Sequence, residues 1–258
     1  MVEKNILYSN ILGKGRPFVI LHGFLGMNDN WKTHGKQLSE YGFEVHLMDQ
    51  RNHGSSFWDD TFNYQVLSDD LKQYCHAHNL NNIILLGHSM GGKTAMLFAT
   101  QHPEVVSKLI VADISPKFYP IHHQTILEGL NALNFDDIKT REAADQAIGK
   151  YITDFGTRQF LLKNLYWKEK GQLAWRINLR VLTKEIEEVG AALPYPAIFT
   201  KDTLFLRGEK SNYITLDDET LIKHHFPKAM IKSIKKAGHW LHAENPKDFF
   251  EALINFVD

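Results

Sequence analysis

The chain has 258 residues, of which 43% are hydrophobic and 23% charged, so it carries enough apolar material for one sizeable core. This composition excludes a disordered or a fibrous protein. Lysine and arginine total 29 against 30 acidic residues, a net charge of −1 without a long run of either sign, so we expect no nucleic-acid partner. Because Cys75 is the single cysteine, an internal disulfide or a thiolate zinc cluster is impossible, and we expect a cytoplasmic protein without a metal or cofactor.

No segment has the pattern of a membrane protein. Residues 1–5 include an acid and precede no apolar stretch of signal-peptide length. The longest apolar runs fall far short of the ~18 residues needed to span a bilayer, so we expect no membrane insertion. Nothing in the sequence indicates an oligomeric state.

Short apolar runs alternate with helical stretches along the first 112 residues. We expect strands at residues 17–21, 44–48, 82–86 and 108–112, and helices at residues 64–78 and 91–102. Runs that are apolar almost throughout are typical of strands buried on both faces of a parallel sheet. The alternation predicts the α/β class.

The pattern changes between about residues 117 and 192. Strand-like runs vanish there, and helical segments rich in leucine and aromatic residues follow one another, including residues 160–162 and 173–189. Strands resume at residues 202–206 and 229–234, and residues 246–257 form an amphipathic helix. We therefore expect a core of residues 1–116 and 196–258, with a helical cap inserted as residues 117–195.

The sharpest motif is a G-x-S-x-G sequence at residues 87–91, between an apolar strand and a helix. A nucleophile elbow requires this context, because the glycines allow close backbone approach in a tight turn that presents the serine. The helix N-terminus that follows favours developing negative charge. Ser89 is therefore the predicted nucleophile, and we expect His88 to be structural.

The same residues also satisfy a phosphate-binding pattern. Gly87 is followed at the P-loop spacing by Gly92, Lys93 and Thr94, and Asp113 ends a strand as a magnesium-binding aspartate would. A nucleoside triphosphatase is therefore an alternative. It gives no role to the glycine-containing turns at residues 22–26 and 238–239.

Those two turns supply what an activated serine needs. Residues 22–26 follow a strand, so the backbone N–H groups of Phe24 and Met90 are the predicted oxyanion hole. His239 follows the last strand and comes after Ser89 in the chain order of hydrolase triads, which makes it the predicted base. His242 is its main competitor.

Together these motifs resemble the α/β-hydrolase superfamily over nearly the whole chain. Residues 49–56 and 113–116 resemble more narrowly the small capped bacterial esterases of the YbfF type. The resemblance implies a mostly parallel, doubly wound sheet with an inserted helical cap, and hydrolysis of a small-molecule acyl ester or thioester. We expect residues 51–53 to brace their loop.

The triad acid departs from the wider superfamily pattern. Many relatives carry it in a Gly-x-x-Asp turn, where this chain has residues 208–211 without an aspartate. The YbfF-type resemblance and the strand-end position favour Asp113 instead, since a triad needs a carboxylate beside its histidine. Glu209 is the alternative acid, and a histidine without a direct acid partner is the third alternative. Ser211 either supports His239 by a hydrogen bond or caps the following turn.

Two further functional hypotheses stay open. One is another reaction on the same triad, such as carbon–carbon bond hydrolysis or a lyase step, and the other is a ligand-binding protein with an idle triad. Four aromatic residues of the cap suit either an apolar substrate pocket or the core of the cap: Phe160, Tyr166, Trp167 and Trp175.

Overall fold

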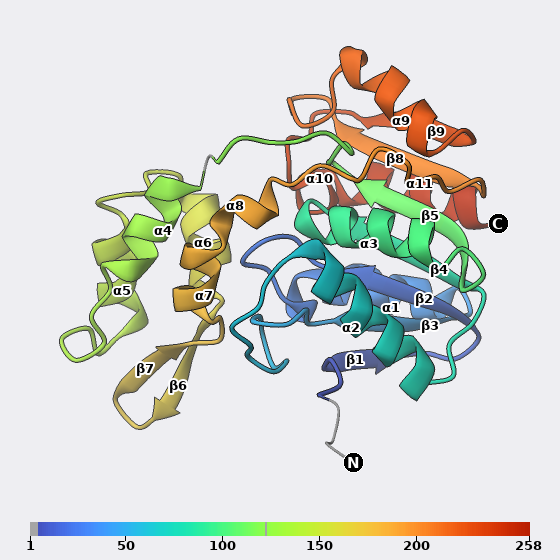
Figure 1. Cartoon of the computed structure of the whole chain (residues 1–258). Coiled ribbons are helices and arrows are strands. Elements are labelled where there is room, and N and C mark those ends of the chain that lie inside the picture. Colours follow the sequence, from blue (N-terminus) through green and yellow to red (C-terminus); the bar gives the residue numbers. More distant parts are fainter. Residues whose placement is uncertain (1–4, 122) are drawn as a thin grey trace.

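A seven-stranded sheet forms the centre of the molecule (Figure 1). The structure is a computed structural model, and it describes residues 5–121 and 123–258. The strands run in the order β1-β3-β2-β4-β5-β8-β9, and all neighbours are parallel except β1 and β3. Their bounds are β1 Ser9–Leu12, β2 Arg16–Leu21, β3 Phe43–Met48, β4 Ile83–His88, β5 Val106–Ala112, β8 Thr203–Gly208 and β9 Ala229–Ile234.

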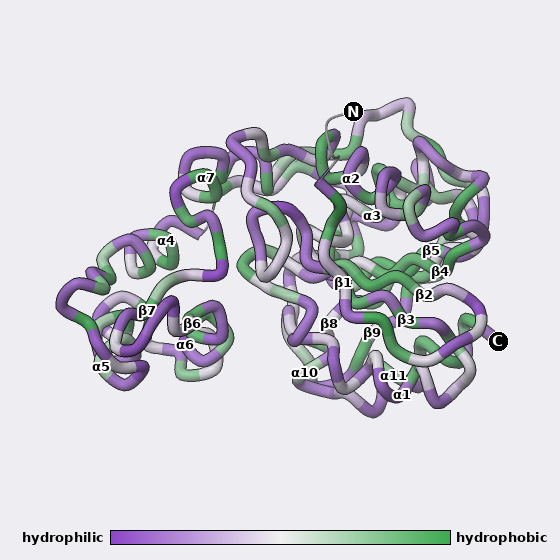
Figure 2. Tube along the Cα trace, turned by 90° about the horizontal axis from the view of Figure 1, so that it is seen from below, coloured by the Kyte–Doolittle hydropathy of each residue, from purple (hydrophilic) through white to green (hydrophobic). Residues whose placement is uncertain are grey.

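Helices cover both faces of this sheet, as its apolar sequence predicts. In β4, Ile83 and Leu85 pack on one side, whereas Ile84 and Leu86 pack on the other. The first side meets α2 (Tyr64–Ala77), α3 (Met90–Gln101) and α9 (Glu219–His225), and the second meets α1 (Lys32–Glu40), α10 (Leu241–Glu244) and α11 (Pro246–Val257). Figure 2 shows the hydrophobic residues concentrated along the central strands.

Six strands lie where the sequence predicts them, and β1 was not predicted. Three of its four residues are half-buried and it pairs only with β3 at the sheet edge, so it lacks the continuous apolar run of a central strand. The α/β fold with a mostly parallel sheet is confirmed.

Between β5 and β8 the chain leaves the sheet. We call residues 117–195 the cap segment, which lies to the left of the sheet in Figure 1. It contains α4 (Gln124–Asn131), α5 (Arg141–Ile148), α6 (Phe155–Leu162), β6 (Leu165–Glu169), β7 (Gln172–Trp175), α7 (Leu179–Lys184) and α8 (Ile186–Val189).

The β6–β7 hairpin corrects the prediction of an entirely helical cap. Residues 173–175 lie in β7, and two short helices replace the single helix expected up to residue 189. Gly171 adopts φ +80° in the connecting turn, and Leu165 and Leu173 are buried. This glycine between two short aromatic runs is a hairpin signal that the helical interpretation missed.

Candidate active site

Ser89 lies in the sharp turn between β4 and α3. Its backbone adopts φ 53° and ψ −119°, an unfavourable conformation that costs on the order of 1–3 kcal/mol and needs support from its surroundings. A Cβ atom on Gly87 would lie 2.1 Å from the Gly91 oxygen, and one on Gly91 would lie 2.5 Å from the Leu21 oxygen. Both positions of the motif therefore require glycine.

The predicted base and acid meet this serine in one hydrogen-bonded series. The Ser89 hydroxyl donates to His239 Nε2 at 3.0 Å, and His239 Nδ1 donates to Asp113 Oδ2 at 2.8 Å. Asp113 is fully buried just beyond β5, and its second oxygen accepts the Gly208 N–H at 2.9 Å. The arrangement fixes the histidine tautomer that leaves Nε2 free to accept the serine proton.

Two other candidate groups, Glu209 and Ser211, have partners other than His239. The Glu209 carboxylate accepts the Lys236 N–H at 2.7 Å on the surface, away from His239. Ser211 donates to Asp113 Oδ2 and accepts the Tyr213 N–H at 3.2 Å. Of the two alternatives for Ser211, the structure shows the turn cap, and its bond to the triad goes to Asp113.

The neighbouring histidines are structural in their contacts. His88 donates through Nε2 to the backbone oxygen of His239 at 2.9 Å, so it holds the turn that carries the ring of His239. His242 stacks on Trp31 with ring centroids 4.1 Å apart, and burial lowers its pKa to about 3. A base for serine needs a pKa near neutrality and a contact with the hydroxyl, and His242 has neither.

Sequence reasoning missed Tyr213. Its ring stacks on His239 with centroids 3.9 Å apart and planes inclined by 18°. Burial raises its pKa to about 12, so it stays neutral beside the imidazole. Its position in the loop after β8 was the available signal, because loops at that sheet edge carry the site.

The residues predicted for the oxyanion hole flank the nucleophile. Gly26 N–H closes a turn onto the Gly23 oxygen at 3.0 Å, with Phe24 and Leu25 at its centre. Within residues 5–121 and 123–258, neither the Phe24 nor the Met90 amide donates a hydrogen bond. Phe24 lines one cavity that contains Ser89, and Met90 lines another.

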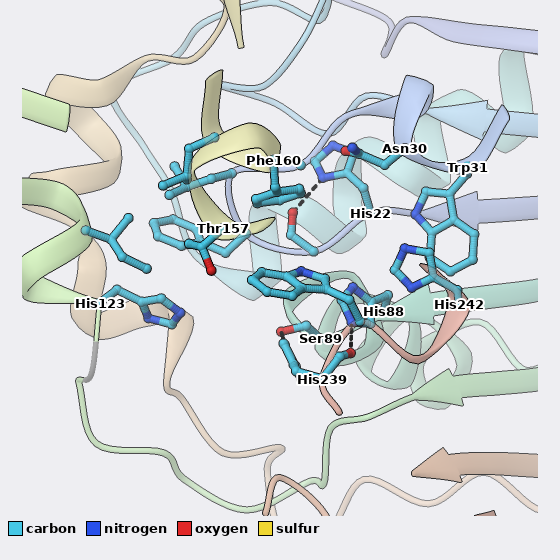
Figure 3. A pocket seen from close by; sticks show the side chains of 17 residues that line it. His22, Asn30, Trp31, His88, Ser89, His123, Thr157, Phe160, His239 and His242 are labelled. Atoms are coloured by element: carbon cyan, nitrogen blue, oxygen red, sulfur yellow. Dashed lines mark hydrogen bonds between the residues drawn. The ribbon is translucent and has the colours of Figure 1, made fainter. Parts of the chain in front are cut away.

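The first of these cavities lies between the sheet edge and the cap segment and encloses about 570 Å³, part of it open to solvent. Figure 3 shows Phe160, Thr157 and His123 reaching toward Ser89 from the cap segment. Tyr166 and Trp175 line a different pocket, and Trp167 is 49% exposed. Of the four cap aromatic residues, only Phe160 lines this cavity.

Ser89 also lines a second cavity. Its empty space, open solvent included, is about 340 Å³, and its walls include Ile114, Ile186, Val189 and Tyr213. The space in it that a water-sized molecule can occupy is only about 20 Å³, so it holds little more than one water beside Ser89.

Comparison with known proteins decides the family. Residues 16–246 match the family model described as alpha/beta hydrolase fold. The chain belongs to the α/β hydrolase family. It is 36% identical to the sn-1-specific diacylglycerol lipase ABHD11 of Xenopus laevis, over 95% of this chain and 80% of that protein. It is 30% identical to Esterase YbfF of Escherichia coli, over 94% and 93%.

The solved structures agree. This α/β hydrolase superposes on a structure described as a marine microorganism esterase with a TM-score of 0.95 and 39% identity, covering 98% of this chain and 100% of the other. Together with the relatives, this likeness shows that the chain is a serine hydrolase that cleaves carboxylic esters.

The P-loop interpretation is wrong for this α/β hydrolase. Lys93 is almost completely buried, and its ammonium donates to the backbone oxygens of Pro116, Lys117 and Ala191. Burial and the nearby Lys117 lower its pKa to about 7. A phosphate-binding lysine must point into the loop, whereas this one joins α3 to both ends of the cap segment.

Two observations bear on metals and membranes. Within the part of the chain that the structure describes, no three His, Cys, Asp or Glu side chains gather as metal ligands. The described helices include none that is both long and apolar enough to cross a membrane.

Proposed function

We propose that this α/β hydrolase cleaves uncharged carboxylic esters or thioesters through an acyl-enzyme on Ser89. The Ser89 oxygen attacks the acyl carbon while His239 Nε2 takes its proton, and Asp113 stabilises the imidazolium. The amides of Phe24 and Met90 donate to the oxyanion. His239 then protonates the leaving alcohol or thiol, and water attacks the acyl-enzyme by the same route.

One observation carries this assignment. A hydroxyl, an imidazole and a buried carboxylate from three separate strand ends are joined by hydrogen bonds of 3.0 and 2.8 Å. The carboxylate also accepts the Gly208 N–H, which fixes its orientation toward His239, where it can offset the positive charge that forms on the imidazole.

The cavities support an uncharged substrate. Among the described residues, the walls of the first cavity include no lysine, arginine, aspartate or glutamate. Its apolar walls include Leu25, Ile126 and Phe160, and those of the second include Ile114 and Ile186. Placing a charge there without a partner would be costly, so a neutral acyl group with an apolar chain fits best.

The domain division is part of the proposal. Residues 117–195 act as the cap. Residues 1–116 and 196–258 together form the catalytic core. The cap's α6, together with His123 and Ile126, lines the cavity beside Ser89, which supports a role in substrate selection. We also propose a cytoplasmic location, since Cys75 is buried and unpaired; cell fractionation tests it.

The assignment is tested by Ser89→Ala on p-nitrophenyl acetate and butyrate. Turnover should fall by about 10⁶, as removal of a serine nucleophile does in a well-studied hydrolase. A fluorophosphonate should label the wild type at Ser89 and leave the variant unlabelled. Circular dichroism controls for folding, and a folded variant within tenfold of wild-type turnover would refute the mechanism.

A further inference from the structure

The turn that carries the proposed oxyanion donor has an unfavourable backbone. Leu25 adopts φ +59°, in the left-handed region where residues other than glycine are uncommon, although glycine occupies positions 23 and 26 of the same turn. A leucine stays in this conformation only where its neighbours hold it. Its side chain is buried, and its carbonyl accepts the Asn164 side-chain amide at 2.8 Å.

The backbone N–H of Leu25 is hydrogen-bonded to a histidine from another loop. Leu25 N–H donates to His53 Nε2 at 3.2 Å, and His53 Nδ1 donates to the Arg51 oxygen at 2.9 Å. A neutral imidazole has one donor and one acceptor, so the bond to Arg51 determines that Nε2 is the acceptor. His53 is fully buried.

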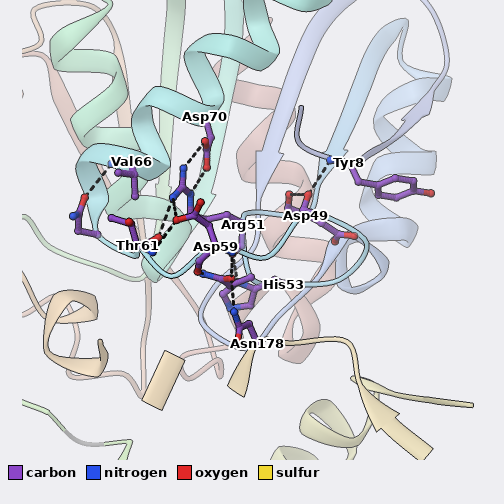
Figure 4. A network of polar contacts seen from close by, with 12 residues as sticks. Tyr8, Asp49, Arg51, His53, Asp59, Thr61, Val66, Asp70 and Asn178 are labelled. Atoms are coloured by element: carbon purple, nitrogen blue, oxygen red, sulfur yellow. Dashed lines mark hydrogen bonds and ion pairs between the residues drawn. The ribbon is translucent and has the colours of Figure 1, made fainter. Parts of the chain in front are cut away.

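The loop that carries His53 is itself fixed from two sides (Figure 4). Arg51 donates to both carboxylate oxygens of Asp70, from Nε at 2.5 Å and from an η nitrogen at 2.7 Å. Asn178 of the cap segment donates its backbone N–H to the Asn52 oxygen at 3.0 Å. The ring therefore has a fixed position from which to hold Leu25.

His53 Nε2 stays a hydrogen-bond acceptor over the pH range of an esterase assay, because the ring stays neutral there. Burial, with a smaller contribution from His22, lowers the pKa of His53 to about 3. The groups that face His53 are His22, Phe24 and Phe62 by ring contact, Asp49 by its charge, and the backbone of Leu25 and Arg51. A protonated ring would lose the lone pair that accepts from Leu25.

We propose that His53 is a positioning residue for the oxyanion hole, which fixes the Leu25 peptide so that the neighbouring Phe24 N–H is directed at the oxyanion. This inference rests on the proposed function, because it presupposes an oxyanion formed at Ser89. His53 lines neither of the cavities that contain Ser89. Loss of a complete donor costs about 10²–10³ in turnover, so a displaced donor should cost about 10–100-fold.

Two amide variants separate this role from simple burial. In His53→Gln, the side-chain oxygen reaches the place of Nε2 and can accept from Leu25. In His53→Asn, the shorter amide reaches only the place of Nδ1, so the bond to Arg51 is kept and the bond to Leu25 is lost. His46→Gln is the control, because His46 is equally buried and hydrogen-bonded to Tyr74, but lies on β3 outside both cavities.

The readouts are kcat and KM on p-nitrophenyl butyrate, and inhibition by a trifluoromethyl ketone, which forms an oxyanion when serine attacks it. His53→Asn should lower kcat by about 10–100-fold with KM within about twofold, and should weaken the inhibitor by the same factor. His53→Gln should restore both to within a few-fold. His46→Gln should change the melting temperature alone.

The inference fails if folded His53→Asn keeps wild-type kcat, or if kcat falls while the trifluoromethyl ketone binds as before. It also fails if His53→Gln is as impaired as His53→Asn. Ser89→Ala is assayed in parallel, because activity in that variant would overturn the proposed function itself. An inactive Ser89→Ala beside a normal His53→Asn would reject the positioning role alone.

Discussion

The sheet edge and the cap segment are built in different ways. At the edge, Ser89 and Asp113 directly follow β4 and β5, whose parallel pairing places His88 opposite Ala112. Ser89 N–H then donates to the Ala112 oxygen, and Asp113 N–H donates to the Leu206 oxygen. The backbone ladder thus sets the spacing of the reactive groups.

The cap segment contributes to the site from helices and loops, without such a ladder. Polar contacts join it to the core: the Lys93 side chain donates to backbone oxygens at both ends of the segment, Asn164 donates to the Leu25 carbonyl, and Asn178 donates to the Asn52 side chain. The reactive groups thus lie on a rigid sheet edge, whereas the cap segment is held by side-chain contacts, including the buried Leu127 and Leu130, which belong to the same hydrophobic cluster as one face of the sheet.

The largest expected effect lies at the sheet edge. Asp113→Asn should lower kcat/KM on a short ester by about 10⁴, because an amide cannot stabilise the imidazolium and favours the wrong histidine tautomer, as the same substitution does in a serine protease. Glu209→Gln is the control and should stay within a few-fold, since its carboxylate accepts the Lys236 N–H on the surface. If Glu209→Gln lowered kcat/KM more than Asp113→Asn did, and both variants were folded, the triad acid would be Glu209 in the loop after β8.

Low pH should destabilise the folded protein through its buried histidines. Burial lowers the pKa values of His22, His53 and His242 to about 4, 3 and 3. In the unfolded chain they titrate near ~6.5, so between that pH and the folded-state values the unfolded state binds more protons. The free energy of unfolding should therefore fall as pH drops, with a limiting slope of about 1.4 kcal/mol per pH unit for each histidine.

This acid effect is measured by urea unfolding from about pH 7.5 to about pH 4.5, which spans the window in which these histidines bind protons only when unfolded. His242→Phe, which keeps an aromatic ring stacked on Trp31, should flatten the slope. An unchanged slope in that variant would show that His242 does not contribute to the acid sensitivity.

The attachment of the cap segment should depend on Lys93. Lys93→Met leaves buried backbone oxygens of Pro116, Lys117 and Ala191 without their donor, at a cost of about 1–3 kcal/mol. Urea unfolding measures this loss, and limited proteolysis should cut the cap segment faster. Lys108→Met is matched, since Lys108 donates to the Phe256 oxygen entirely within the core.

Equal cleavage of the cap segment in Lys93→Met and Lys108→Met would contradict the special role of Lys93. ATP should not raise the melting temperature of the wild type or of either variant. Saturable stabilisation by ATP would instead support a nucleotide site.

The smallest expected effect concerns Ser211. Ser211→Ala removes one of the hydrogen bonds to Asp113 and leaves those from Gly208 and His239. The transition state should lose about 0.5–1.5 kcal/mol of stabilisation, which lowers kcat/KM roughly 2–10-fold. A decrease as large as that of Asp113→Asn would show that this hydroxyl is required to hold the acid in place.

The sequence predicted the strand ends and the groups on them, because each signal is local. An apolar run, a glycine-bounded turn and a helix identify the position of Ser89 from a few adjacent residues. The hairpin of the cap segment was missed because aromatic residues at short spacing fit a helix as well as a strand. The edge strand β1 was missed because it lacks the apolar run of a buried strand.

The sequence by itself determined the α/β class, the elbow and the order of serine and histidine along the chain. Only the tertiary structure placed Asp113, and not Glu209, against His239, joined the Ser211 hydroxyl to Asp113, and buried Lys93 against the ends of the cap segment. Asp113 and His239 are 126 positions apart, and Leu25 and His53 are 28 apart. Such pairs meet through strand order and register, which no local pattern of residues specifies.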